Sequence, residues 1–350
     1  MTVREALFER ANSLNVVRLL LASSVVVWHA WPLGNAGERP GWVYPIGLTA
    51  VPAFFCLSGF LIARSRLHHT FLRFMWHRSL RILPALWVVL LVVAFIAAPA
   101  STLVGGSWGV PAAIEYLRGN GPLGEGYMEV QGTIGDAAWN GSLWSLYYEF
   151  FAYVGAGLLL STSLVRRHAA LVTTATYLAA VGYAGWTFGR IDAADPNFSS
   201  VVAQLLTCYL AGMVLYLWSD RIRVDGRIAV AAAVLVVGCW FAGVMHVFGG
   251  LPLAYLLVWA GASIPARWVQ RNDISYGVYI YAFPVQVSLE WFLPALPVAF
   301  HVVAALLVTC PLAYLSWRVV EKPALRLRHL DAQRCCTPPR SDGAHSVQAR

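Results

Sequence analysis

The chain has 350 residues, of which 59% are hydrophobic and only 12% are charged, whereas a soluble globular domain is about 25% charged. This composition excludes a water-soluble domain, a disordered protein and a collagen-like or disulfide-rich secreted protein. The formal net charge of +8 raises the question of a nucleic-acid partner, but the basic residues lie between apolar segments and never in one patch, which argues against it.

Ten apolar segments approach the length of about 20 residues that a helix needs to cross a bilayer. They lie at 14–33, 46–63, 80–98, 143–161, 169–188, 200–218, 228–247, 250–264, 274–292 and 298–317. The segment at 250–264 is short and contains Pro252, so a tilted or re-entrant segment is an alternative there. The sequence therefore predicts an all-α integral membrane protein, a bundle of about ten transmembrane helices.

The loops between these segments predict the orientation of the chain, because Lys and Arg near span ends are retained in the cytoplasm. Of the 25 basic residues, 22 fall on one side of the membrane, and Arg39, Arg118 and Arg190 fall on the other. Both termini are therefore predicted to be cytoplasmic. The longest loop, 99–142, is expected outside the membrane, and residues 330–350 are expected to form a disordered cytoplasmic tail after a transmembrane domain spanning 1–329.

Ionisable residues inside spans are costly and tend to mark function. In the first span, Arg18 and His29 are almost three helical turns apart, on one face and about 16 Å apart along the axis. Arg78 and Arg81, three residues apart at the entry to the third span, form a guanidinium pair suited to clamp phosphate. The alternative is ordinary anchoring, with the arginines at inner headgroups and His29 at the outer interface.

Glu149 lies about seven residues into the fourth span, roughly 10 Å deep if that span starts at the outer surface. A carboxylate at that depth needs a partner. His29 is at a comparable depth, so Glu149 could orient the imidazole and raise its basicity. A purely structural Glu149, bonded to Tyr or Trp groups of a neighbouring helix, is the competing interpretation.

Six short stretches, in this order, resemble the acyltransferase 3 family of bacterial integral membrane acyltransferases, which O-acylate surface polysaccharides and related acceptors. They are Arg18 followed after ten residues by His29; Phe54-Phe55-Cys56-Leu57-Ser58-Gly59-Phe60-Leu61-Ile62; Arg78-Ser79-Leu80-Arg81; Trp144-Ser145-Leu146-Tyr147-Tyr148-Glu149; Ile274-Ser275-Tyr276-Gly277-Val278-Tyr279-Ile280-Tyr281; and Val320-Glu321-Lys322-Pro323. Two departures stand out. Asn15 occupies a position where many members have Asp, and Ala282 and Phe283 stand where a His is common.

The resemblance implies a multi-pass enzyme of the bacterial inner membrane that moves an acyl group, acetyl above all, from cytoplasmic acyl-CoA to a hydroxyl of a carbohydrate or glycolipid acceptor. Arg18, Arg78 and Arg81 would receive the anionic end of the donor. His29, assisted by Glu149, would either deprotonate the acceptor hydroxyl or relay the acyl group. Ser58, Trp144 and Tyr279 are expected to contact substrate. Acyl-CoA is a co-substrate, and neither a cofactor nor a metal is expected, since the six cysteines show no metal-ligand spacing.

Two other functions fit a polar seam in a membrane bundle. A secondary transporter would use it as a substrate path, although the sequence shows no internal repeat of the kind common in transporters. A polysaccharide-export component without acyl-transfer chemistry is the third alternative.

Overall fold

The computed structural model describes residues 1–8, 12–34, 37–123, 130, 133, 138–187, 198–264 and 272–329. Apart from isolated β-bridges, such as the one between Thr2 and Arg223, these residues form helices and their connections. Each of the ten predicted apolar segments overlaps a helix. These helices are α2 (Leu14–His29), α3 (Val43–His68), α4 (Phe71–Val92), α7 (Trp144–Leu159), α9 (Ala169–Thr187), α10 (Phe198–Leu217), α11 (Gly226–Phe241), α13 (Gly250–Ser263), α14 (Ser275–Phe292) and α15 (Val298–Ser316).

Shorter helices connect and extend the bundle. They are α1 (Val3–Phe8), η1 (Pro32–Gly34), η2 (Val93–Ala97), α5 (Ala98–Ala100), η3 (Ser101–Val104), α6 (Val110–Asn120), α8 (Ser163–Arg167), α12 (Met245–Phe248), η5 (Trp317–Glu321), α16 (Lys322–Arg326) and η6 (Leu327–His329). The segment predicted as the longest loop, 99–142, therefore contains a helix of its own, α6.

In the described part of the chain, three continuous helical segments are long and apolar enough to cross a membrane: Val43–His68, Phe71–Val104 and Val298–Arg326. Four further apolar helices are shorter: Leu14–His29, Val201–Leu217, Gly226–Phe241 and Gly250–Ser263. These features support a helical membrane protein. The number of ten spans and the cytoplasmic position of both termini stay predictions, and the predicted tail 330–350 lies outside the described residues.

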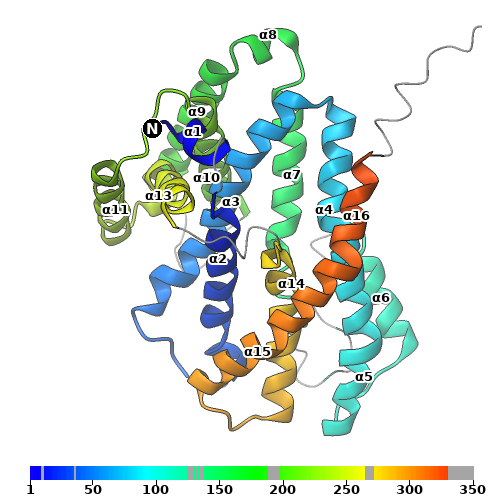
Figure 1. The fold of residues 1–350 in the computed structure, drawn as a ribbon. Helices are drawn as coiled ribbons and strands as arrows, with labels where there is room; N and C mark the ends of the chain where they lie inside the picture. The colour runs from blue at the N-terminus through cyan, green and yellow to red at the C-terminus, as the bar shows by residue number, and fades with distance from the viewer. Residues whose placement is uncertain are drawn as a thin grey trace, which may run out of the picture.

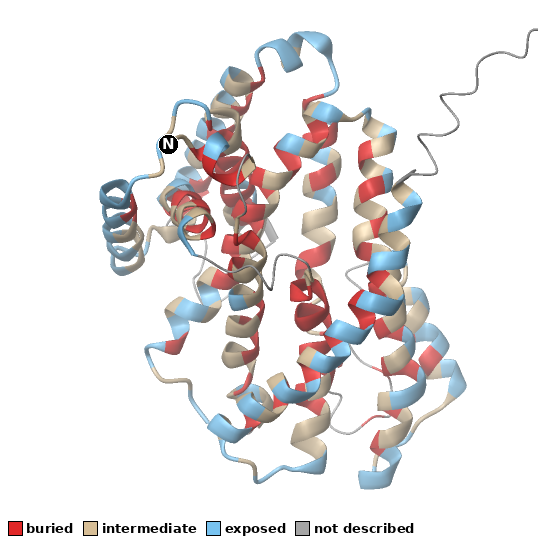
Figure 2. Ribbon diagram, in the orientation of Figure 1, coloured by how far each residue is buried: buried red, intermediate tan, exposed pale blue. Residues whose placement is uncertain are grey.

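Helix α14 runs through the middle of the bundle, between α2 and α4, and α15 packs against it (Figure 1). Every residue from Ser275 to Pro284 is buried, whereas the helices at the margin, such as α11, expose most of their residues (Figure 2). A central helix that is buried on all sides is typical of a bundle whose polar residues face inward.

Helices α3 and α10 pack at very short range because each carries a glycine at the contact. A Cβ atom built on Gly59 would lie 1.9 Å from the carbonyl oxygen of Tyr209, and one built on Gly212 would lie 1.9 Å from the carbonyl oxygen of Cys56. Small residues that let two backbones touch are a common device for holding membrane helices together. Gly59 follows Ser58 directly, so this contact also fixes the position of Ser58.

Candidate active site

A cavity of about 90 Å³ lies inside the bundle, among α2, α3, α4, α7 and α14. Its polar wall includes most of the residues that the sequence predicts for the site. These are Arg18, Ser58, Arg78, Arg81, Glu149 and Tyr279, joined by Ser145, Tyr153, Ser275 and Tyr276. The structure thus brings side chains from five helices, and from segments more than 200 residues apart, to one buried space.

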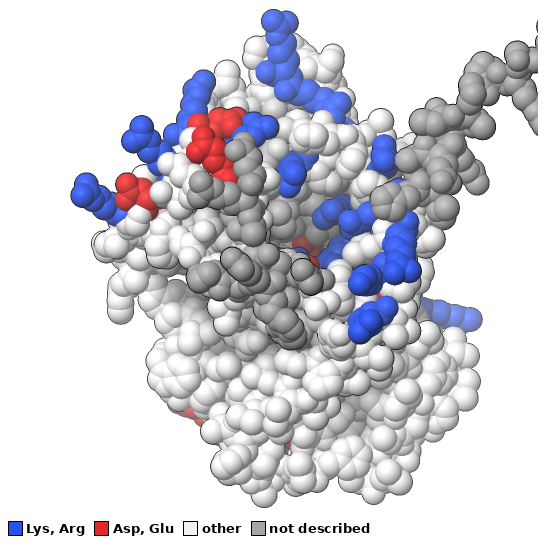
Figure 3. Space-filling model, viewed as in Figure 1, with Lys and Arg blue, Asp and Glu red and all other residues white. Residues whose placement is uncertain are grey.

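This cavity adjoins a wider pocket of about 490 Å³, which we call the basic vestibule. It is lined by Arg18, Leu61, Arg64, Ser65, His68, His69, Arg78, Arg81, Leu325 and Arg328. The cavity and the vestibule share Arg18, Leu61, Arg78 and Arg81. Figure 3 shows Lys and Arg side chains gathered over one half of the molecule, around a hollow, while the other half of this face is almost free of charge. The vestibule therefore opens at the end predicted to be cytoplasmic.

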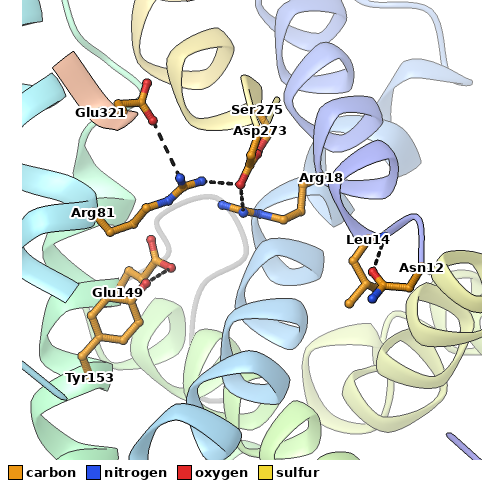
Figure 4. Close-up of polar contacts among 9 residues, drawn as sticks. All are labelled: Asn12, Leu14, Arg18, Arg81, Glu149, Tyr153, Asp273, Ser275 and Glu321. Atoms are coloured by element: carbon orange, nitrogen blue, oxygen red, sulfur yellow. Dashed lines mark hydrogen bonds and ion pairs between the residues drawn. The ribbon is translucent and has the colours of Figure 1, made fainter. Parts of the chain in front are cut away.

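Arg18 and Arg81 meet on one carboxylate, that of Asp273 (Figure 4). Arg18 Nη1 donates to Asp273 Oδ2 at 2.6 Å, Arg81 Nη2 donates to the same oxygen, and Ser275 Oγ donates to Oδ1 at 2.6 Å. Burial by itself raises the pKa of Asp273, but Arg18 and Arg81 outweigh it, and with the hydrogen bonds they hold that pKa well below its usual range. This carboxylate therefore stays ionised and ties α2 and α4 to the start of α14.

Glu321 brings a second carboxyl group to the same network. Its Oε2 lies 3.9 Å from Arg81 Nη1, and Ser316 Oγ donates to its Oε1 at 3.4 Å. The side chain is 1% exposed. Arg18 and Arg81, two of the three arginines predicted to bind the donor, are thus already in contact with acidic side chains of the protein.

Arg78 is different from its two neighbours. Among the described residues it forms no ion pair within 4 Å, its buried Nε has no hydrogen-bond partner, and its guanidinium lies 6.0 Å from the ring centroid of Tyr153. Glu149 lines the same cavity without reaching it. A buried guanidinium without a bonded counterion favours binding of an anion.

Glu149 is bonded to two hydroxyl groups and not to His29. Ser58 Oγ donates to Glu149 Oε1 at 2.7 Å, and Tyr153 Oη donates to the same oxygen at 2.5 Å. Ser142 is 3% and Ser145 is 5% exposed, so α7 begins among buried side chains, and the depth of Glu149 in the membrane stays a prediction. The cluster of Ser58, Glu149 and Tyr153 therefore lies beside Arg78.

His29 lies at the other end of α2, outside the residues that line the cavity. Its ring packs edge-on against Phe283 with 5.1 Å between centroids, and Phe283 is one helical turn beyond the cavity-lining Tyr279. His29 is thus about 6 Å further along the α14 axis than the cavity. Its Nδ1 lies 2.9 Å from the carbonyl oxygen of Val25. Since a carbonyl only accepts, Nδ1 carries the proton, and Nε2 of the neutral ring is left with the lone pair of a base.

The two aromatic residues predicted to contact substrate lie in different places relative to the cavity. Tyr279 lines the cavity, but its hydroxyl donates to the carbonyl oxygen of Ser142 at 2.6 Å and lies 2.7 Å from Ser145 Oγ, so it anchors the start of α7. Trp144 is not among the lining residues and packs edge-on against Tyr148. A substrate contact of Trp144 remains a prediction.

Sequence reasoning missed Asp273 and Tyr153 as site residues and placed Glu321 only within a motif. Nothing in the sequence marked Asp273 as a site residue, because it lies in a predicted loop directly before the span at 274–292, where a charged residue is ordinary. Tyr153 lies one turn after Glu149 on the same helix face, and this spacing could have identified it.

Comparison with known proteins gives the family. A family model described as an acyltransferase domain matches residues 11–318. This chain belongs to the acyltransferase 3 family. The match covers α2 through α15, and with them the cavity and Arg18, Arg78, Arg81 and Glu149. The chain is thus an acyltransferase, and the family match favours this interpretation over the transporter and export-component alternatives.

Two relatives align over nearly the whole chain. "Nodulation protein 10" of Rhizobium leguminosarum bv. viciae is 27% identical over 362 residues, covering 91% of this chain and 94% of the relative. The "O-acetyl transferase" of Shigella phage Sf6 is 25% identical over 343 residues, covering 89% and 96%. No solved structure matches the chain significantly.

Proposed function

We propose that this protein is a multi-pass O-acetyltransferase of the bacterial cytoplasmic membrane. It takes an acetyl group from cytoplasmic acyl-CoA and transfers it to a hydroxyl of a carbohydrate or glycoconjugate acceptor. The O-acetyl transferase among its relatives supports the acetyl group and the hydroxyl acceptor. The orientation with ten spans and both termini in the cytoplasm follows from the basic loops.

The observation that carries the donor assignment is Arg78, at the junction of cavity and vestibule, which has no bonded counterion in the part of the chain that the structure describes. Arg18 and Arg81 share Asp273 and Glu321, whereas Arg78 has no bonded counterion within the described residues. Arg64 and Arg328, which also line the vestibule, have no acidic partner there either. A carrier with several phosphates, such as CoA with roughly four negative charges, fits this excess of positive charge.

The route of the acyl group follows from the order of the residues along the bundle. With the phosphates at Arg78, the flexible arm of the donor extends past Ser58 and Tyr279 toward His29. There, Nε2 of His29 accepts the proton of the acceptor hydroxyl as its oxygen attacks the thioester carbonyl. The C–S bond breaks, an O-acetyl ester forms, and the sulfur leaves as free CoA thiol once it takes up the proton from His29.

Glu149 acts in this scheme as a positioning residue. It holds the hydroxyls of Ser58 and Tyr153 at the wall of the cavity. The aromatic edge of Phe283 packs against His29 and fixes its ring. Direct transfer needs no further nucleophile.

The test is release of free thiol from acetyl-CoA by membranes that contain equal amounts of wild type, His29→Ala or Arg78→Ala/Arg81→Ala, with crude glycan as acceptor. We expect release by the wild type and its loss in both variants. Arg221→Ala is the matched control, because Arg221 is exposed, lies outside the cavity and the vestibule, and stacks on Trp218 at 4.8 Å. Wild-type release no greater than that of empty membranes, also with longer acyl-CoAs, would refute the donor assignment.

A further inference from the structure

The corner between α3 and α4 holds four basic side chains whose buried nitrogens have no hydrogen-bond partner among the residues that the structure describes. These are Nδ1 of His69, Nε of Arg73, Nε2 of His77 and Nε of Arg328. We call these four residues the corner site. His69 and Arg328 also line the basic vestibule, so the corner site is continuous with the space assigned to the donor.

Buried N–H groups are almost always hydrogen-bonded in proteins, so four orphaned nitrogens in one place need an explanation. The side chain of His77 is only 8% exposed, and its ring packs edge-on against His69 with 4.8 Å between centroids. The titratable and charged groups that act on His77 are His69, Arg328, Arg73 and Arg78, and none of them is acidic. An anion would supply the partner that none of these neighbours provides.

The pKa values of His69 and Arg328, which lie outside the spans, indicate the same positive surroundings. Burial and then Arg73 lower the pKa of His69, and burial together with Arg78 and Arg81 lowers the pKa of Arg328 to about 10. Both shifts disfavour the protonated form, which is the opposite of what a carboxylate partner would do. A bound anion would reverse both.

The start of α4 adds to this positive field. The helix begins at Phe71, and its N-cap residue Thr70 makes no side-chain capping hydrogen bond. Arg73 is in the first turn. The amides of this first turn and the positive end of the helix dipole add to the positive charge at this end of α4.

Arg66 and Arg166 have a different role, which separates them from the corner site. Arg66 donates to the carbonyl oxygens of Gly157 and His69, and Arg166 donates to those of Arg66 and Leu67. They cap the end of α3 and are satisfied by the protein itself.

We propose that the corner site, made of His69, Arg73, His77 and Arg328, binds a terminal phosphomonoester of the acyl donor. In CoA this is the phosphate on the ribose, which is separate from the diphosphate bridge. A phosphomonoester has three acceptor oxygens and nearly two negative charges, which suits four converging donors. The inference rests on the proposed function, because it assigns the bridge to Arg78 and the additional phosphate to the corner.

The experiment compares CoA with 3′-dephospho-CoA, which lacks only this phosphate. Binding is measured by calorimetry on the full chain in phosphatidylcholine nanodiscs at constant salt. We expect the wild type to bind CoA at least about tenfold more tightly, the equivalent of one charge-assisted hydrogen bond. Arg73→Gln and His77→Gln should reduce this preference to about threefold or less, with the affinity for 3′-dephospho-CoA retained. That retained affinity also shows that the variants are folded.

Arg64→Gln is the matched control, since Arg64 lines the vestibule but not the corner, with its guanidinium 4.2 Å from the ring centroid of Phe8. It should weaken both ligands by a similar factor and keep the preference for CoA. Arg73→Lys, which keeps the charge, should retain part of it.

Three results would overturn the assignment in different ways. Equal binding of the two ligands by the wild type, or an unchanged preference in Arg73→Gln, would refute the corner site while leaving the donor intact. Failure of the wild type to bind either ligand would refute the proposed donor as well. A preference that disappears in nanodiscs containing phosphatidic acid, with 3′-dephospho-CoA still bound, would assign the corner to a lipid headgroup and overturn its assignment to the donor.

Discussion

Replacing Asp273 with Asn tests whether the ion network holds the site together. The wild-type carboxylate accepts from Arg18 at 2.6 Å, from Arg81, and from Ser275 at 2.6 Å. The side chains of Asp273, Arg81 and Arg18 are 12%, 13% and 21% exposed. The Asn side chain has nearly the same shape but no charge, so both guanidinium groups lose their shared counterion.

The expected cost follows from this geometry. Breaking a buried ion pair from one side costs about 3–5 kcal/mol, because the remaining charge stays buried. The partial exposure of Arg18, the second contact of Arg81 with Glu321 at 3.9 Å and the oxygen that Asn retains reduce this. We therefore expect Asp273→Asn to lower the free energy of unfolding by roughly 2–3 kcal/mol.

The matched control is Asp220→Asn, which removes an ion pair of similar length from the surface. Arg4 Nη1 lies 2.7 Å from Asp220 Oδ2, but the two side chains are 53% and 59% exposed. Such exposed pairs contribute at most about 1 kcal/mol. Unfolding by SDS in bicelles, at equal protein concentration, compares the two variants with the wild type. Equal destabilisation by the two substitutions would refute the buried network as the source of the effect.

Wild type and Asp273→Asn also give a test of the pH dependence of stability. The pKa of Asp273 is held lower in the folded chain than in the unfolded one, so its contribution is complete above the unfolded value of about 4. It is lost as the pH falls below that value. The stability difference between wild type and Asp273→Asn should shrink as the pH falls below about 4. A difference that grows on acidification would contradict this.

Two further substitutions follow from the packing and from the cavity. Gly59→Ala should lower the free energy of unfolding by roughly 2–3 kcal/mol in the same assay, because its Cβ would meet the carbonyl oxygen of Tyr209. The control is Gly155→Ala, which should be neutral because nothing lies within 4 Å of its Cβ. Equal effects of the two substitutions would contradict the close contact. Glu149→Gln should lower kcat for acetyl transfer by about tenfold to a hundredfold with little change in KM for acetyl-CoA. The control Glu115→Gln, on the exposed face of α6, should change neither kcat nor KM. A change in KM alone would argue that Glu149 only binds the donor.

The sequence was sufficient to locate the helices and most of the polar side chains in the cavity wall. Apolar runs mark bilayer-spanning segments directly, so each predicted range overlaps a helix. The start of α4 was missed by nine residues, since the helix begins at Phe71 and the apolar run at 80. A helix continues through residues such as Arg73 and His77 beyond the apolar stretch, and hydropathy marks only the part that is consistently apolar.

Lateral position could not be read from the sequence. Depth along a span suggested that His29 and Glu149 meet, but the Glu149 carboxylate is bonded to Ser58 and lines the same cavity as Arg78. The partner of Arg18 is 255 residues away, at Asp273. Neither spacing nor depth indicates such a pair, because the order of helices around the bundle decides which faces meet.

The central claim is that the donor enters from the arginine-rich end of the bundle, on the cytoplasmic side. Its most direct test is thiol release from acetyl-CoA, which does not cross membranes, by inside-out and by right-side-out vesicles that contain the same amount of protein. We predict release by inside-out vesicles alone, and its loss there in Arg78→Gln. Equal release by intact right-side-out vesicles, or full activity of Arg78→Gln, would contradict the account.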